Sequence, residues 1–177
     1  MNTKQPNIRT GDVTVRTVTL SDAPAVRALR LEALTNHPTI FSRTPAEIDL
    51  IDWTEQAANG SGSGDQAIFV GESNGDLVAM AGIVRNTGIK TRHSAFIWGV
   101  YVKPSSRGAR VAEMLIHACV HWARGKGLTI IRLTVMVGNE KAIACYRRCG
   151  FEITGREVAA LHWEGVDYDE HLMSRRV

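Results

Sequence analysis

Residues 98–115 read WGVYVKPSSRGARVAEML and change from a strand pattern to a helix pattern across a short basic loop. The β-branched and aromatic residues at the start favour a strand, and the apolar spacing of Val111, Met114 and Leu115 predicts a helix. Two arginines bracket a Gly-Ala pair between these elements. The first N–H groups of a helix lack intrahelical partners and lie at the positive end of its dipole, where anions bind. This loop is therefore either an ordinary turn or a site for phosphate groups.

Outward from this loop, alternating and apolar runs predict strands on both sides of it. The predicted strands are Val13–Thr19, Ala67–Glu72, Leu77–Val84, Ser94–Val102, Thr129–Val137, Glu152–Leu161 and Asp167–Arg176. The predicted helices run from Ser21 to before Pro38, from Thr44 for about three turns, from Gly108 to Gly125 or Gly127, and over Glu140–Arg148. This order predicts an α/β (α+β) fold, with a mixed central sheet of roughly six to seven strands flanked by about four helices.

The composition indicates a globular protein with a mixed surface. Hydrophobic residues make up 44% of the 177 residues, and the formal net charge is +3. The charges are scattered along the chain rather than grouped in a block, which argues against a nucleic-acid partner. We expect a flexible N-terminal tail over residues 1–11 and a single domain over residues 12–177.

The cysteines, the histidines and the N-terminus bear on metal binding and location. The three cysteines form no CxxC motif, so neither a disulfide framework nor a zinc knuckle is indicated. His117 and His121 share a predicted helical face but lack a third ligand, so we expect no metal. The N-terminus is polar rather than a signal peptide, and no apolar run is long enough to span a bilayer. We therefore expect a cytoplasmic protein with no membrane partner.

A second informative segment, residues 131–155, reads IRLTVMVGNEKAIACYRRCGFEITG. An apolar strand is followed by a Gly-Asn turn, by a short helix that carries Tyr146, and by a Gly-Phe pair that begins the next strand. A tyrosine in such a helix is by itself more often a half-buried packing residue than a catalyst. The order of the two segments along the chain carries more information than either segment alone.

Together, the two segments resemble the GNAT superfamily of acyl-CoA N-acyltransferases. In that family a loop of the form Arg/Gln-x-x-Gly-x-Gly/Ala holds the pyrophosphate of coenzyme A through backbone amides, and residues 107–112 (RGARVA) are similar to it. Arg110 stands where the family usually has its middle glycine. The family pattern Asn-x-x-Ala-x-x-x-Tyr-x-x-x-Gly-Phe is matched at Asn139, Ala142, Tyr146, Gly150 and Phe151. The resemblance covers roughly Val13 to the C-terminus and implies a GNAT-like, mostly antiparallel sheet.

The resemblance implies an enzyme, an acyl-CoA-dependent N-acetyltransferase that uses acetyl-CoA (coenzyme A) as cosubstrate. Tyr146 matches the family's general acid for the CoA thiolate, and Asn139 matches a position that contacts the pantetheine arm or the acceptor. The strand Trp98–Val102 is expected beside the pantetheine arm, with a bulge at Gly99. The implied cofactor-binding residues are Val100, Tyr101, Val102, Arg107, Gly108, Ala109, Arg110, Val111, Ala112, Asn139 and Tyr146.

The acceptor is implied to be the primary amine of a small molecule, an amino acid or a peptide. An alkylammonium ion has a pKa near 10.4, so it must lose a proton before it attacks. The general base is not evident: the alternatives are a water-mediated base, an acceptor that arrives neutral, or one of Glu47, Asp49, His93 and His162. The residues expected to line the acceptor site are Phe41, Glu47, Trp98 and Trp163. A non-catalytic acetyl-CoA sensor is the alternative function, and a homodimer is compatible with the resemblance.

Overall fold

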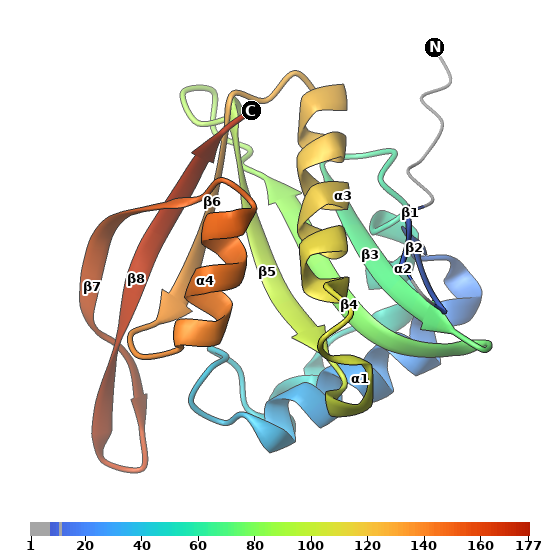
Figure 1. Cartoon of the computed structure of the whole chain (residues 1–177), viewed down its shortest axis with the longest axis horizontal. Coiled ribbons are helices and arrows are strands. Elements are labelled where there is room, and N and C mark those ends of the chain that lie inside the picture. Colours follow the sequence, from blue (N-terminus) through green and yellow to red (C-terminus); the bar gives the residue numbers. More distant parts are fainter. Residues whose placement is uncertain (1–7, 11) are drawn as a thin grey trace.

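The computed structural model describes residues 8–10 and 12–177 of the chain (Figure 1). The strands are β1 (Ile8–Thr10), β2 (Val13–Thr17), β3 (Gln66–Ser73), β4 (Asp76–Arg85), β5 (Ser94–Val102), β6 (Ile130–Met136), β7 (Glu152–Trp163) and β8 (Val166–Arg176). The α-helices are α1 (Ala23–Asn36), α2 (Trp53–Asn59), α3 (Val111–Gly125) and α4 (Glu140–Arg148). Short 3-10 helices are η1 (Leu20–Asp22), η2 (Pro45–Leu50) and η3 (Pro104–Ser106).

Within the described residues the strands form one eight-stranded sheet in the order β1-β2-β3-β4-β5-β6-β8-β7. Neighbouring strands are antiparallel except β5 and β6, which are parallel. The chain crosses from β6 through α4 to the outer strand β7 and returns as β8, which lies between them. The fold class predicted from the sequence is confirmed, and β1 adds a strand to the expected number.

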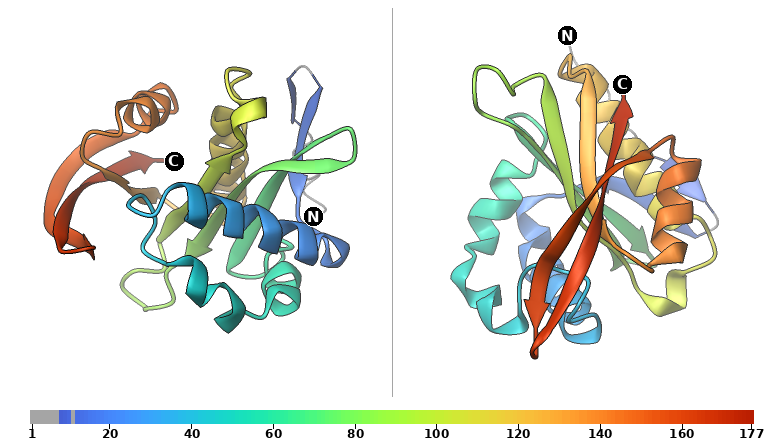
Figure 2. Two further views of the ribbon diagram at one scale, coloured as in Figure 1. Left: turned by 90° about the horizontal axis from the view of Figure 1, so that it is seen from below. Right: turned by 90° about the vertical axis from the view of Figure 1, so that its left-hand side faces the viewer.

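Helices cover both faces of the sheet (Figure 2): α3 and α4 lie on one face, and α1 and α2 lie on the other. Strand β3 shows how the sequence supports this arrangement. Its residues Ala67 and Phe69 belong to the core that contains the buried side of α3, whereas Ile68 and Val70 belong to the core that contains the buried side of α1. A strand whose successive side chains are buried on opposite faces must be apolar at every position, which explains this uninterrupted apolar run.

The prediction of one continuous helix from Thr44 is wrong, because two separate short helices form there. Residues Pro45–Leu50 form the 3-10 helix η2, and Ile51 then has an extended backbone. The carboxylate of Asp52 accepts hydrogen bonds from the N–H groups of Thr54 and Glu55, each at 2.9 Å, and so begins α2 as a separate helix. The cap at Asp52 outweighs the apolar spacing that suggested one continuous helix.

Three residues of the predicted N-terminal tail, Ile8–Thr10, form strand β1. Ile8–Thr10 pair with Val13–Val15 of β2 as an antiparallel edge strand, which satisfies backbone N–H and C=O groups on that edge. The other residues of the predicted tail, 1–7 and 11, lie outside the described residues. None of the described helices is long and apolar enough to cross a membrane.

Candidate active site

Strands β5 and β6 separate partway along their length and open the sheet (Figure 1). Their parallel pairing is confined to Ser94–Phe96 of β5 and Ile130–Arg132 of β6. Beyond these pairs β5 continues to Val102 and β6 continues to Met136. The remaining backbone groups on this edge of β5 no longer pair with β6, and an unpaired strand edge can bind an extended ligand through main-chain hydrogen bonds.

A bulge bends β5 where the opening begins. Gly99 has a φ of +64°, in the left-handed region that favours glycine, and the register against β4 shifts at this point. The bulge predicted at Gly99 is confirmed. Just before it, the indole of Trp98 lies over Gly82, where an added Cβ would meet the ring at 2.1 Å. Glycine at position 82 therefore makes room for the indole of Trp98.

A cavity of about 800 Å³ occupies the opening, which is a volume typical of small-molecule sites. Residues from α1, from the two separated strands and from the starts of α3 and α4 all line it. The predicted site residues that line it are Phe41, Trp98, Val100, Tyr101, Val102, Arg107, Gly108, Arg110, Val111, Ala112, Asn139 and Tyr146. The predicted residues Ala109, Glu47 and Trp163 do not line it.

The loop between β5 and α3 contains two residues with left-handed backbones. Gly108 has a φ of +90°, and Arg110 has a φ of +56° and is the N-cap of α3. The Arg110 side chain makes no capping hydrogen bond, so the first N–H groups of α3 gain no partner from it. Val111 and Ala112, the first residues of this helix, line the cavity. The positive end of the α3 dipole therefore faces the cavity. The helix begins at Val111, three residues after the predicted start at Gly108.

The two arginines of this loop have different surroundings. Nε of Arg107 donates a hydrogen bond to the carbonyl of Val102 at 3.0 Å, and Nη2 of Arg107 lies 3.3 Å from Nε2 of His37. These contacts tie the loop to the end of β5 and to the residue that follows α1. Both arginines are exposed and border the cavity, but the Arg107 guanidinium already contacts Val102 and His37, so Arg110 is the arginine better placed to meet an anion there.

Tyr146 and Asn139 border the same cavity from α4. Oδ1 of Asn139 accepts a hydrogen bond from the N–H of Ala142 at 3.3 Å and caps the helix. Tyr146 lies on the buried side of α4 and packs edge-on against Phe151, with 6.3 Å between ring centres. Burial raises the pKa of the Tyr146 phenol well above its usual value near 10, so this hydroxyl keeps its proton at neutral pH.

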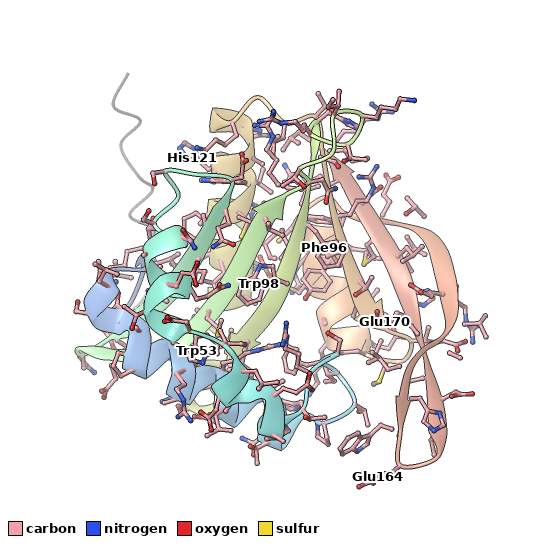
Figure 3. All side chains as sticks on the ribbon, turned by 180° about the vertical axis from the view of Figure 1, so that it is seen from behind. Trp53, Phe96, Trp98, His121, Glu164 and Glu170 are labelled. Atoms are coloured by element: carbon pink, nitrogen blue, oxygen red, sulfur yellow. The ribbon has the colours of Figure 1, made fainter. Side chains whose placement is uncertain are left out.

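The side chains that line the cavity lie on two faces of the sheet. Met173 of β8 belongs to the core shared with α3, so Glu170, three residues earlier on the same strand, points to the opposite face. Trp98 packs against the core that contains α1, on that same opposite face. Figure 3 shows Trp98 and Glu170 on the face that carries α1 and α2. The opening between β5 and β6 joins this half of the cavity to the half bordered by α3 and Tyr146.

Two glutamates face each other across the last hairpin and line the cavity. Glu157 of β7 and Glu170 of β8 are direct cross-strand partners. Burial raises the pKa of Glu170, and the charge of Glu157 raises it further, whereas a hydrogen bond with Thr134 lowers it. Like charges opposite each other destabilise a sheet, so this pair favours a bound cation. Sequence reasoning missed both residues, because the pairing register that brings them together is set by the folded hairpin.

An irregularity in β7 adjoins the glutamate pair. The register of β7 against β8 shifts after Glu157, and Ala159 has a φ of +52°. The N–H of Ala159 donates to Oδ1 of Asp169 at 2.8 Å, and Nε of Arg156 donates to Oδ2 of the same carboxylate at 2.7 Å. Asp169 therefore holds this bulge in place, next to Leu161 in the cavity wall.

Two residues expected at the acceptor site have other positions. The carboxylate of Glu47 accepts hydrogen bonds from the backbone N–H and the hydroxyl of Thr44, at 2.7 and 3.0 Å, and closes a capping box at η2. Trp163 ends β7 beside Glu164, which marks the tip of the β7–β8 hairpin in Figure 3, away from Glu170.

The other base candidates also lie outside the lining of the cavity. Asp49 forms an ion pair with Arg27 on the surface, and Nδ1 of His162 lies 2.6 Å from Oδ1 of Asp167 in the last hairpin. His93 is exposed just before β5. Among the described residues, no group of three or more His, Cys, Asp or Glu side chains could hold a metal ion. Glu157 and Glu170 are therefore better placed than the predicted candidates to accept a proton in the cavity.

Known proteins that are similar to this chain are acetyltransferases by name. The family model described as "Acetyltransferase (GNAT) family" matches residues 26–151. The chain is similar to an L-methionine sulfoximine/L-methionine sulfone acetyltransferase of Pseudomonas aeruginosa, with 26% identity over 80% of this chain and 81% of the relative. It is also similar to an aminoglycoside N(6')-acetyltransferase type 1 of Stenotrophomonas maltophilia, with 29% identity over 68% of this chain and 90% of the relative.

Solved structures share the fold over most of the chain. A GNAT-family acetyltransferase from Streptococcus pneumoniae superimposes with a TM-score of 0.81 at 19% identity and covers 93% of this chain and 99% of its own. The structure of yncA from Salmonella typhimurium, determined with its cofactor acetyl-CoA, has a TM-score of 0.80 at 18% identity and covers 94% of each chain. The opened sheet, the uncapped start of α3 and the match to the family model lead to one conclusion. The chain belongs to the GNAT acetyltransferase family and is an acetyl-CoA-dependent N-acetyltransferase that acts on amines.

Proposed function

We propose that the protein acetylates the primary amine of a small molecule, an amino acid or a peptide by direct attack of the amine on the acetyl thioester. In this proposal Glu170 accepts the proton of the acceptor ammonium, and Tyr146 donates a proton to the sulfur that leaves. The observation that carries the proposal is the single cavity that passes through the sheet, with Glu170 on one face and Tyr146 on the other. The names of the two relatives describe acetylation of small molecules, which favours a small acceptor.

The residues around the opening suit acetyl-CoA, which supplies the activated acetyl group. The N-terminus of α3 and the exposed Arg110 favour the negatively charged phosphates. The edge of β5 at Val100 and Val102 offers backbone groups to the pantetheine arm, which carries amides of its own. Oδ1 of Asn139 accepts the hydrogen bond that caps α4, so we assign this residue a role in positioning the helix. Its Nδ2 group can then donate a hydrogen bond to the cofactor.

The proton transfers follow from the surroundings of the two titratable side chains. An alkylammonium ion with a pKa near 10.4 is unreactive until it loses a proton. The carboxylate pair attracts this cation, and the raised pKa of Glu170 brings it closer to the range in which a base works at neutral pH. The phenol of Tyr146 stays protonated and can stabilise the thiolate by hydrogen bonding as the C–S bond breaks. The lack of an evident base in the sequence supports the sensor alternative, and Glu170, as a candidate base in the cavity, favours the enzyme instead.

A thiol-release assay tests the proposed function. Purified protein is mixed with acetyl-CoA and a panel of amines, amino acids, antibiotics and peptides, and free CoA is measured with a thiol reagent. We expect release that depends on an acceptor, with a matching acetylated product in the mass spectrum. Calorimetric binding of acetyl-CoA without release on any acceptor would instead support the sensor alternative.

Reversing the charge of Arg110 is expected to weaken the binding of coenzyme A. The Arg110→Glu variant places a carboxylate where the phosphates are expected, and we expect Kd to rise at least about tenfold, since charge-assisted contacts to phosphate are strong. Arg107→Glu is also expected to weaken binding, but it breaks the contacts with Val102 and His37 as well.

Calorimetry with coenzyme A and with pantetheine checks this prediction. Pantetheine lacks the nucleotide and its phosphates, so its affinity should be the same in the Arg110→Glu variant and the parent protein. Arg124→Glu, in the last turn of the same helix, is the matched control and should leave both affinities unchanged. Equal affinity of coenzyme A for the Arg110→Glu and Arg124→Glu variants would contradict the assignment of this loop.

A further inference from the structure

Arg30 is a buried arginine that borders the cavity and was not expected there. It lies on α1 with 6% of its surface exposed, and Nη1 has no hydrogen-bond partner among the described residues. Arginine is rarely buried without a partner, because removing its charge from water is unfavourable unless an anion compensates. The proposed reaction with a simple amine gives no role to this cation.

The Arg30 guanidinium is held between the ring of Phe41 and the backbone at Gly99. It stacks over the ring of Phe41, with 4.5 Å between Cζ and the ring centre. Nη1 lies 3.5 Å from the point that a Cβ on Gly99 would occupy, so the guanidinium reaches the bulge at which β5 begins to diverge. Phe41 and Gly99 also line the cavity. The ring of Phe41 therefore holds the guanidinium against the acceptor half of the opening.

The chain itself provides no anion for this guanidinium. Glu32, on the same helix, accepts a hydrogen bond from the hydroxyl of Tyr101 at 2.8 Å and forms an ion pair with Lys103. Among the described residues, Arg30 forms no ion pair. Burial lowers the pKa of Arg30 to about 10, and the charge of Arg43 adds to this, yet Arg30 stays protonated at neutral pH. A cation that is protonated, buried and unpaired is suited to an anion supplied by a ligand.

The acceptor half of the cavity therefore offers charges of both signs. Glu157 and Glu170 suit an ammonium group, and Arg30 suits a carboxylate. Guanidinium matches the planar, two-oxygen geometry of a carboxylate better than any other side chain does. A polycationic acceptor would place a positive charge beside Arg30, so the cavity favours a zwitterion over an aminoglycoside or a polyamine.

We propose that Arg30 binds the carboxylate of the acceptor, and that the substrates of this enzyme are amino acids and other amines that carry a carboxylate. The inference rests on the proposed function, because the amine is the group that the carboxylate positions at Glu170. Arg30 acts as a specificity residue and takes no part in the proton transfers.

Matched acceptors test the inference directly. Each L-amino acid is assayed beside its methyl ester and beside the amine that lacks the carboxyl group, and kcat/KM is measured by thiol release. We expect the parent protein to prefer the free amino acid about 100-fold, as a charge-assisted pair in a desolvated site would give. In Arg30→Met the preference should disappear through a rise in KM for the acid, while kcat/KM for the ester and the amine stays close to that of the parent.

Two further variants separate recognition from structure. Arg27→Met removes a surface arginine from the same helix and should keep the full preference for the acid. Arg30→Lys keeps the charge but loses the two-pronged geometry, and it should keep part of the preference. Arg30→Met should also raise Tm, because a buried cation without a partner is replaced by an apolar side chain of similar length. A variant that had merely failed to fold would show a lower Tm and lose activity with every acceptor.

The outcomes that overturn the inference differ from those that overturn the proposed function. A parent protein that acetylates amines without preferring the carboxylate refutes the role of Arg30 and leaves the function standing. An equal fall in kcat for acid, ester and amine in Arg30→Met also refutes it, because that pattern belongs to stabilisation of the tetrahedral oxyanion. Absence of thiol release with every amine refutes the proposed function and the inference together.

Discussion

Replacing Tyr146 with phenylalanine is expected to lower kcat about 100-fold at neutral pH, because a positioned general acid typically contributes a factor of this size or more. The change removes one hydroxyl group and keeps the ring, so the edge-on contact with Phe151 and the packing of α4 remain. Binding of acetyl-CoA should stay close to that of the parent protein, since residues 107–112, which are proposed to bind its phosphates, are unchanged. The loss should therefore appear in kcat rather than in the dissociation constant of the cofactor.

A matched tyrosine variant controls this experiment. Tyr168 lies on β8 outside the lining of the cavity, and Tyr168→Phe should keep the parental kcat. The raised pKa of Tyr146 adds a second expectation: titration of this phenol should cause no loss of activity with rising pH until well above pH 10. Unchanged turnover by the Tyr146→Phe variant on a good acceptor would exclude this residue as the acid.

The second large effect is expected at Glu170. Changing this residue to glutamine keeps its size and its hydrogen-bonding capacity but removes the carboxylate that accepts the proton of the acceptor. We expect kcat/KM at neutral pH to fall about 100-fold, in line with the loss of a general base. The deficit should shrink as the pH approaches the pKa of the acceptor amine, because free amine is then present without help from the enzyme. A pH-independent deficit would argue that Glu170 only positions the acceptor.

Glu157 provides the companion variant, and the direction of its effect can be worked out. Burial and the charge of Glu157 both raise the pKa of Glu170, and the cavity also holds the cation of Arg30. Glu170 must be deprotonated to act as a base, so activity should rise with pH through a pKa above the ordinary value near 4.3 for a glutamate. Removing the neighbouring charge in Glu157→Gln lowers that pKa. The acid side of the pH–rate profile should therefore move to lower pH, with a much smaller fall in the maximum rate than Glu170→Gln gives.

Together these residues assign different tasks to the two faces of the sheet. The face with α3 and α4 holds the groups suited to phosphates and to the leaving sulfur, and the face with α1 holds the charged groups suited to the acceptor. Because β5 and β6 diverge, the groups on the two faces of the sheet line one continuous cavity. The bulge at Gly99 is central to this arrangement, since it lies in the opening and beside Arg30.

The sequence by itself predicted most of the strands and helices, the loop proposed to bind the cofactor and the tyrosine proposed as the general acid. Apolar periodicity and the glycine expected to end a helix at Gly125 or Gly127 are local signals, so they indicate strands and helices without reference to distant residues. The same holds for residues 107–112 and for Tyr146, whose motifs are contiguous in the chain. The bulge at Gly99 was predictable too, because glycine inside a strand is a local feature.

Only the tertiary structure shows which residues line the half of the cavity proposed for the acceptor. Glu157 and Glu170 are brought together by the register of a hairpin with a bulge, and sequence spacing does not reveal that register. Glu47 is acidic and near the right segment, yet its carboxylate is used by Thr44 at the start of η2. One sequence feature indicates that Arg30 is buried: it lies four residues after Val26 and four before Leu34, on the buried side of α1. The role of a charged residue at such a position can be inferred only from the fold. Its burial and its partners depend on residues that are distant in sequence and close in space.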